Sequence, residues 1–171
     1  PGRDFNYRKA KMAWYNVDRS VFYSSGGLRP DNISDDDLRN HYVRAIIPQE
    51  IFRQRDPGQV NLNLNVLDLA YFPRERGQQN YNPNLDANGF LTNPQQNFAG
   101  VSRGFDQETN FLNSNFQYIE FWIMDPFIDG ANGRVLDGIF NENNTTGGDL
   151  IFNLGSVSED LVPDGSFFFE N

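Results

Sequence analysis

Apolar and polar residues alternate in several short stretches of this 171-residue chain, and Asn, Gly and Pro separate those stretches. Such alternation is typical of β-strands, whereas an amphipathic helix repeats its apolar residues every three or four positions. Aromatic residues, which fit pleated surfaces, make up 15% of the chain. The pattern predicts an all-β domain with long loops and one short helix. The main strands are expected at residues 10–17, 61–72, 116–125 and 149–155.

Short strands with turns between them are the pattern of a β-sandwich, and a galactose-binding-like jelly roll is one form of it. A chain of 171 residues suits one domain and needs no disulfide or metal to fold. The chain begins Pro1-Gly2, without an initiator Met or a signal-peptide pattern. We therefore expect a single domain over residues 1–171, excised from a much larger protein.

The stretch at 116–125 is apolar at both alternating sets of positions. This predicts a central strand that is covered on both faces. Trp122 lies in this stretch, and Trp14 lies in the strongly patterned stretch at 10–17. Both tryptophans are therefore expected in the core.

Other strands are expected with irregularities. The alternation at 61–72 shifts its phase near Leu67, which predicts a β-bulge. Residues 42–52 are expected to be strand, interrupted by Pro48 because proline removes a ladder donor. Further short strands are expected at residues 20–23, 98–104 and 134–140.

One helix start and one long loop stand out. Ser34 can cap a short helix that has Asp37 in its first turn and runs to about Asn40. Residues 73–97 lack periodicity and are rich in turn formers, so they are expected to form a long loop. Two readings stay open: a functional loop, or an ordered cover over a sheet face that is anchored by Tyr81, Leu85, Phe90 and Leu91.

Composition limits the classes of partner. Acidic residues outnumber basic ones, 23 to 14, and the formal net charge is −9. Nucleic-acid-binding proteins usually present a basic surface, so we expect no nucleic-acid partner. The absence of Cys excludes a disulfide framework, a Cys-ligated zinc site and a thiol nucleophile. No apolar run approaches the roughly 20 residues that a membrane-spanning helix needs, so no span is expected in this segment.

Catalytic residue types are sparse. The single histidine, His41, follows the predicted helix, and no Gly-x-Ser-x-Gly elbow is present. Glu120 and Asp125 lie about 16 Å apart in an extended strand and face opposite sides, so they do not form a catalytic pair. Glu120 is expected to pair with Arg44 or Arg103 instead. We therefore expect no enzymatic activity and no organic cofactor.

Two groups of residues are candidates for binding. The loop region after the strand at 116–125 offers oxygen ligands of the kind that Ca²⁺ prefers, although the spacing is not that of an EF-hand. The metal candidates are Asp125, Asp129 and Asp137, and solvated loop acids are the alternative. Exposed aromatic rings are suited to stacking on sugars, and core packing is the alternative for them. The candidate binding residues are Tyr71, Phe72, Arg74, Arg76 and Tyr81.

Four segments together resemble one known family. They are Trp14–Asp18, Asp68–Gly77 with Tyr81-Asn82 after it, Tyr118–Phe127, and Phe152–Asp160 followed by Asp164-Gly165 and Phe169–Asn171. In this order they resemble the soluble module of the SprA/Sov proteins, the outer-membrane translocons of the type IX secretion system in gliding and related bacteria. The similarity spans roughly residues 10–171.

The resemblance implies a cell-envelope protein of a Bacteroidota-type bacterium, on either the periplasmic or the extracellular side of the outer membrane. The family's full chain forms a very large outer-membrane β-barrel that passes folded cargo. This chain would be a non-catalytic structural and protein-interaction module attached to that barrel. Its expected partners are the barrel, accessory secretion subunits or secreted cargo. The alternative function is a carbohydrate-binding β-sandwich module with a structural Ca²⁺.

Overall fold

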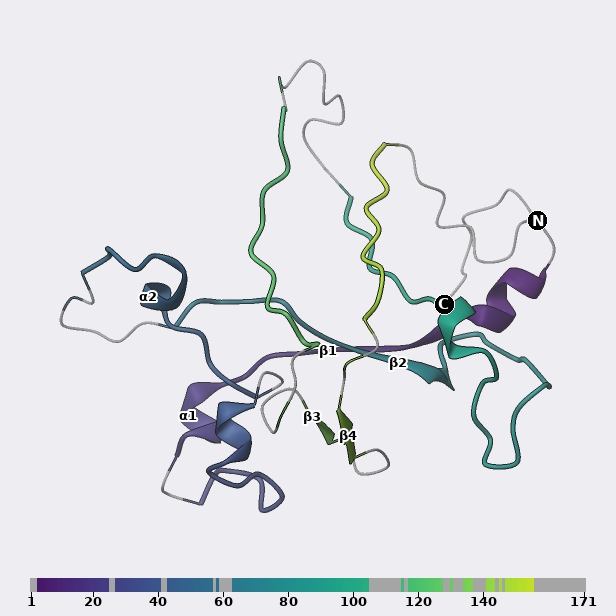
Figure 1. Cartoon of the computed structure of the whole chain (residues 1–171), viewed down its shortest axis with the longest axis horizontal. Helices are drawn as coiled ribbons and strands as arrows, with labels where there is room; N and C mark the ends of the chain where they lie inside the picture. Colours follow the sequence, from purple (N-terminus) through teal and green to yellow (C-terminus); the bar gives the residue numbers. More distant parts are fainter. Residues whose placement is uncertain are drawn as a thin grey trace. The chain divides into compact units, whose positions relative to one another are not determined.

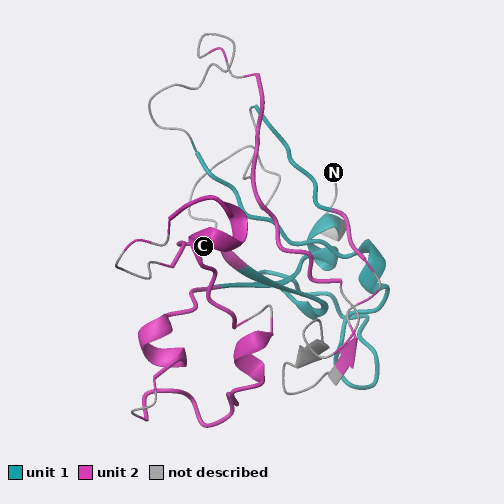
Figure 2. Cartoon of the chain, turned by 60° about the vertical axis from the view of Figure 1, so that its left-hand side comes forward, with its two compact units in different colours: residues 1–14, 69–104, 150–171 teal, residues 15–68, 105–149 magenta. Residues whose placement is uncertain are grey.

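The computed structural model describes residues 3–24, 27–40, 43–56, 58, 63–104, 115, 117–127, 130, 134–136, 141–143, 145 and 147–155. Contacts divide the chain into two compact units, each built from separate stretches of sequence (Figure 2). Unit 1 comprises residues 1–14, 69–104 and 150–171, and unit 2 comprises residues 15–68 and 105–149. The expectation of a single domain over residues 1–171 stays a prediction.

Short strands and short helices make up the regular structure (Figure 1). This is consistent with a small all-β or mixed fold, so the all-β expectation holds only in its coarse form. Within the described ranges, no helix is both long and apolar enough to cross a bilayer. In chain order the elements are η1 (Arg3–Arg8), β1 (Ala10–Tyr15), α1 (Arg19–Phe22), η2 (Asp37–Arg39), α2 (Pro48–Ile51), β2 (Asp68–Arg76), η3 (Pro94–Gln96), β3 (Arg134–Leu136) and β4 (Asn141–Asn143).

Strands β1 and β2 form a two-stranded sheet that lies almost entirely in unit 1. The Gly77 N–H, just after β2, donates to the Lys9 carbonyl, just before β1, at 3.0 Å. Farther along, Lys11 Nζ pairs with Glu75 Oε2 at 2.5 Å. The two strands therefore run antiparallel, as these pairings require. The other edge of β1 is met by Phe98, which forms a parallel bridge with Lys9 and is the one paired residue of the strand expected at 98–104.

β2 differs from the expected strand at both ends. It begins at Asp68 and continues through Pro73 to Arg76, where a loop was expected. Its half-buried side chains alternate up to Phe72 and then shift phase at Pro73. A phase shift of the predicted kind is thus present, but beyond Leu67. Proline is tolerated in a strand at such an irregular position because no N–H is required of it there.

Asparagine side chains hold the loop that follows β2. Asn80 is buried, and its Nδ2 donates to the carbonyls of Tyr7 and Lys9 at 3.1 and 2.6 Å. Its Oδ1 accepts the Asn82 N–H at 2.9 Å. Leu91, only 2% exposed, anchors the loop as expected. Tyr81, by contrast, is 77% exposed, so its expected role as an anchor is wrong.

Two expected strands in unit 2 are helical turns. Residues 20–23 fall mostly within α1, because the Asp18 carboxylate accepts the Ser20 N–H at 2.8 Å and caps the turn. Pro48 begins α2 rather than breaking a strand. Its missing N–H costs nothing in the first turn of a helix, where that group has no partner. A side-chain cap at α1 and a proline in the first turn of α2 therefore favour helical turns over the expected strands.

The expectation of a central strand at 116–125 is wrong. The described residues of this stretch form no strand (Figure 1). Trp122 is 72% exposed. Trp14 is in β1 as expected but is 69% exposed, so neither tryptophan is a core residue. Alternation predicts an extended backbone, but it does not show that another layer covers the faces. The strand expected at 149–155 is likewise absent from the regular structure.

The strand expected at 134–140 is present in shorter form. β3 pairs antiparallel with β4, with Arg134 opposite Asn143 and Leu136 opposite Asn141. Buried apolar side chains are few among the described residues. They are Ala10 and Leu91 in unit 1, and Val43 and Ile46 in unit 2.

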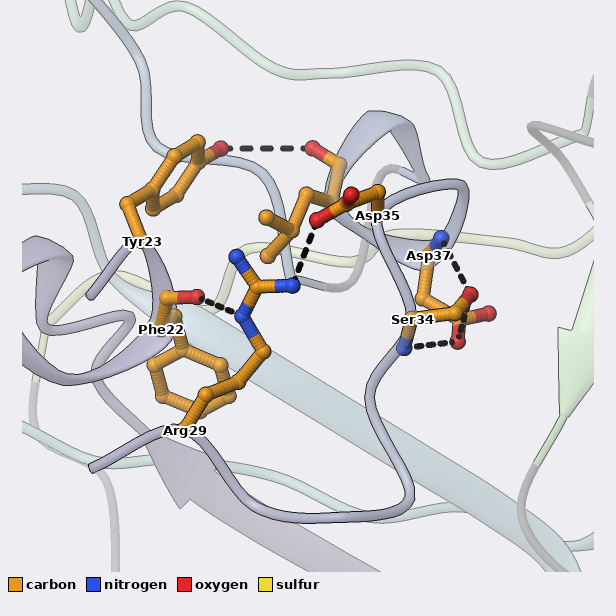
Figure 3. Close-up of polar contacts among 7 residues, drawn as sticks. Phe22, Tyr23, Arg29, Ser34, Asp35 and Asp37 are labelled. Atoms are coloured by element: carbon orange, nitrogen blue, oxygen red, sulfur yellow. Dashed lines mark hydrogen bonds and ion pairs between the residues drawn. The ribbon is translucent and has the colours of Figure 1, made fainter. Parts of the chain in front are cut away.

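A polar cluster in unit 2 fixes the chain between α1 and η2 (Figure 3). Arg29 Nε donates to the Phe22 carbonyl at 2.7 Å, and Arg29 Nη1 pairs with Asp35 Oδ1 at 2.6 Å. The Tyr23 hydroxyl donates to the Leu38 carbonyl at 3.2 Å. These bonds join the end of α1 to the turn that leads into η2. The cluster is therefore structural.

The short helix predicted after Ser34 is present as a 3-10 turn, η2, but it begins at Asp37 with Asp36 as its N-cap, so the cap predicted at Ser34 is wrong. Ser34 N–H and hydroxyl both donate to Asp37 Oδ2, at 2.8 and 2.7 Å (Figure 3). The Asp37 N–H in turn donates to Ser34 Oγ at 3.2 Å. The two residues thus satisfy each other's polar groups in the manner of a capping box. Ser34, through its hydroxyl first and then its N–H, lowers the pKa of Asp37 below the ordinary 3.8.

Replacing Ser34 with Ala should raise the pKa of Asp37 toward its ordinary value and destabilise the fold by no more than about 0.5 kcal/mol at neutral pH, because the hydrogen bonds that it removes are exposed to solvent. Because the folded-state pKa of Asp37 is lowered, its stabilising contribution is complete above 3.8 and is lost as the pH falls through the folded value. Carboxyl NMR titration and urea unfolding at several pH values measure both effects. Asp18, whose pKa is lowered by Ser20, should titrate unchanged in this variant. An unchanged Asp37 titration would contradict the assignment.

Gly77 should not tolerate a side chain. A Cβ at this position would lie 2.5 Å from the Ala10 carbonyl oxygen, so Gly77→Ala should destabilise the fold by about 1–3 kcal/mol. Gly100→Ala is the matched control, because a Cβ there meets no atom within 4 Å. Its effect should stay within about 0.5 kcal/mol. Equal urea midpoints for the two variants would refute the close approach.

Candidate functional site

The five candidate binding residues all belong to unit 1. The structure places Tyr71, Phe72, Arg74 and Arg76 on β2 and sets Tyr81 apart in the following loop. The Tyr71 hydroxyl donates to the Asn97 carbonyl at 2.7 Å, and burial raises the pKa of Tyr71 above its ordinary 10.0. Tyr71 therefore offers a half-exposed ring whose hydroxyl is already engaged.

The Phe72 ring contacts a side chain of the paired strand β1. The Lys11 ammonium lies 4.7 Å from the centre of its ring, while the same ammonium pairs with Glu75. A cation above a ring face is attracted by the ring's negative charge density. The Phe72 ring therefore already contacts a side chain of its own unit and is not a free surface for a ligand.

Arg74 and Arg76 are both exposed and lie two residues apart on β2, so they point to the same face of the strand pair. The Arg74 guanidinium lies 5.5 Å from the centre of the Phe90 ring, and its Nη2 is 3.8 Å from Asp86 Oδ2. The Arg76 side chain makes no hydrogen bond or ion pair with any residue that the structure describes. On this face the Arg74 guanidinium therefore contacts Phe90 and Asp86, whereas the Arg76 guanidinium has no partner among the described residues.

A tight turn holds Phe90 beneath Arg74. Asp86 Oδ1 accepts the N–H groups of Asn88 and Phe90, each at 2.9 Å. The Asp86 N–H donates to the Phe90 carbonyl at 2.8 Å, and Leu91 N–H donates to the Arg74 carbonyl at 2.7 Å. These bonds hold the turn that carries Phe90 beside the backbone of Arg74, and the ring and the guanidinium then meet through a side-chain contact.

Residues 117–127 in unit 2 carry an exposed apolar surface on an irregular backbone. Trp122 makes an edge-on contact with the Phe52 ring, with 6.4 Å between the ring centres, yet it remains largely exposed. Both alternating sets of positions are exposed. The large apolar members are Tyr118, Ile119, Phe121, Trp122, Ile123 and Phe127.

A second exposed apolar segment lies in unit 1, at residues 150–154. It contains Leu150, Ile151, Phe152 and Leu154, and all four are exposed. Soluble proteins seldom leave several large apolar residues in sequence uncovered. Both segments overlap stretches that the sequence predicts as strands, and the one at 116–125 was expected to be covered on both faces.

The metal candidates are only partly within the described residues. Asp125 is exposed, and its Oδ1 accepts the Phe127 N–H at 2.8 Å, which forms a local turn. Asp129 and Asp137 lie outside the described residues. Within the described ranges, no three His, Asp or Glu side chains are grouped closely enough to hold a metal ion. The Ca²⁺ site stays a prediction.

The catalytic candidates do not come together in the described part of the chain. His41 lies outside it, and Glu120 is exposed. Arg44, an expected partner of Glu120, pairs with Glu50 instead, while Arg103 is exposed. A shallow depression beside Glu120 has no second carboxylate, and its lining residues are Asn115, Gln117, Tyr118 and Glu120.

No protein-family model matches the chain. A search of curated proteins likewise finds no significant match.

Proposed function

We propose that this chain is a non-catalytic structural and protein-interaction module of a cell-envelope secretion translocon of the SprA/Sov kind. The observation that supports this proposal is the exposure of two apolar segments, residues 117–127 and 150–154. Interaction surfaces are where large apolar residues remain uncovered in an isolated module. The same two segments overlap the third and fourth segments that carry the family resemblance.

A partner strand is the kind of cover that residues 117–127 require. The segment is apolar at both alternating sets of positions, so a strand formed there needs a layer against each face. Pairing with an extended strand of the translocon would supply backbone hydrogen bonds and bring apolar side chains to both faces. The β-sandwich, jelly roll included, belongs to this proposal as the architecture that the module completes with its partner.

Site-specific photo-crosslinking tests this assignment in a bacterium that has type IX secretion and expresses the full protein. A photoreactive residue at Ile119 should crosslink to the translocon barrel, an accessory secretion subunit or secreted cargo, since Ile119 is exposed within the apolar segment. Arg53, exposed in a turn of the same unit, is the control position. Mass spectrometry identifies the crosslinked chains. Yields at Ile119 no higher than at Arg53 would count against the proposal.

Secretion provides a second readout. Trp122→Ser should reduce cargo secretion while changing the stability of the isolated chain by no more than about 0.5 kcal/mol, because the side chain is 72% exposed. Normal secretion by this variant, with normal protein levels, would argue that the segment is not an interaction surface.

Carbohydrate binding is the second candidate function, and the exposed rings of Trp14 and Tyr81 favour it. Aromatic rings without cover are the surfaces on which sugars stack. A glycan array, read with and without Ca²⁺, should show binding that Trp14→Ala abolishes. Absence of any glycan signal from a folded sample would remove this candidate.

A further inference from the structure

Positive charge is concentrated in part of unit 1 although the whole chain is acidic. Residues 1–14 and 69–104 contain seven Lys and Arg residues but only three Asp and Glu residues, whereas residues 150–171, the remaining stretch of the unit, contain four acidic residues and no basic one. A local reversal of sign in an acidic protein attracts partners of opposite charge at short range. The described part of this basic region is the strand pair β1–β2 and the segments that flank it.

The two faces of the strand pair differ in charge. Lys9 bonds to Gly77 and Lys11 pairs with Glu75, so Ala10 stands opposite Arg76 and Met12 stands opposite Arg74. Glu75 therefore points to the face of Lys11, away from the two arginines. We call the face with Ala10, Met12, Arg74 and Arg76 the arginine face. Asp86 is the one carboxylate that pairs with it among the described residues.

The spacing of the two arginines on the arginine face matches a ligand that carries acidic groups at regular intervals. The two guanidinium groups stand on alternate residues of one strand, about 7 Å apart along the backbone. Arg74 is seated on Phe90, and Arg76 has no partner among the described residues. A guanidinium binds a carboxylate through two parallel hydrogen bonds, which makes the spacing of acceptors matter.

We propose that the arginine face binds an acidic polypeptide segment in extended conformation, with carboxylates on alternate residues facing Arg74 and Arg76. An extended strand repeats its side chains at the same period as β2, so two acidic residues meet the two arginines without bending. A short peptide stays within the local positive field, because charges farther than about 8–10 Å are screened at physiological salt. This inference is independent of the translocon assignment.

Fluorescence anisotropy on the 171-residue chain tests the proposal with two labelled peptides of identical composition. One alternates Glu with Thr, and the other groups all its Glu residues in one block. The alternating peptide should bind more tightly, and added salt should weaken its binding. Arg76→Glu, at a position without a partner to lose, and the double variant Arg74→Glu/Arg76→Glu should each weaken that binding by about tenfold or more.

Arg53→Glu/Arg55→Glu is the matched control. These two arginines are also exposed and two residues apart, but they lie in a turn of unit 2. The control makes the same change in net charge as the double variant, and its affinity should stay within about twofold of the original. Circular dichroism verifies that Arg76→Glu is folded.

Three results would overturn the proposal. Equal affinity for the alternating and block peptides would reduce the effect to general charge attraction, and equal losses in the control and the double variant would do the same. Binding to phosphatidylglycerol vesicles without binding to either peptide would assign the face to lipid instead.

Discussion

The backbone of Lys9 and Ala10 is the junction on which unit 1 depends. The Lys9 carbonyl accepts both the Gly77 N–H and the Asn80 side chain, while the Ala10 N–H donates to Phe98. Three segments distant in sequence therefore meet at one point of the chain. Only glycine fits at position 77, because a Cβ would press on the Ala10 carbonyl. This approach fixes the end of β2 and hence the position of Arg76, which immediately precedes Gly77.

Among the described residues of unit 1, hydrogen bonds from asparagine side chains hold the loop after β2 in place, and few apolar side chains are buried there. Asn80, Asn82 and Asn97 each donate to backbone carbonyls, including those of Tyr7 and Pro73. Buried carbonyls left without donors cost free energy, so these amides specify one path for the loop. An interior of this kind leaves large apolar residues available at the surface. The arrangement favours a module that gains further burial from a partner.

Sequence could predict the features whose causes are local. The Ser34 and Asp37 side chains meet because they are three residues apart, and β1 follows from simple alternation. The turn capped by Asp18 had an equally local signal, which the weak alternation at residues 20–23 concealed. The position of Trp122 could not be predicted in this way. Its burial depends on whether another segment covers it, and alternation carries no information about that.

The candidate site likewise has some features that follow from the local sequence and others that depend on contacts between distant segments. That Arg74 and Arg76 share a face follows from the two-residue period of a strand, once β2 is known to continue past Pro73. That Glu75 pairs with Lys11 depends on a contact across 64 residues, and that Phe90 lies against Arg74 depends on a loop turn. The sequence shows where the charged residues lie along the chain, whereas the packing of distant segments determines which of them form ion pairs. Because the two-residue period of the strand places Glu75 on the opposite face, where it pairs with Lys11, a strand with the local sequence Arg-Glu-Arg presents positive charge on one face rather than a neutralised pair.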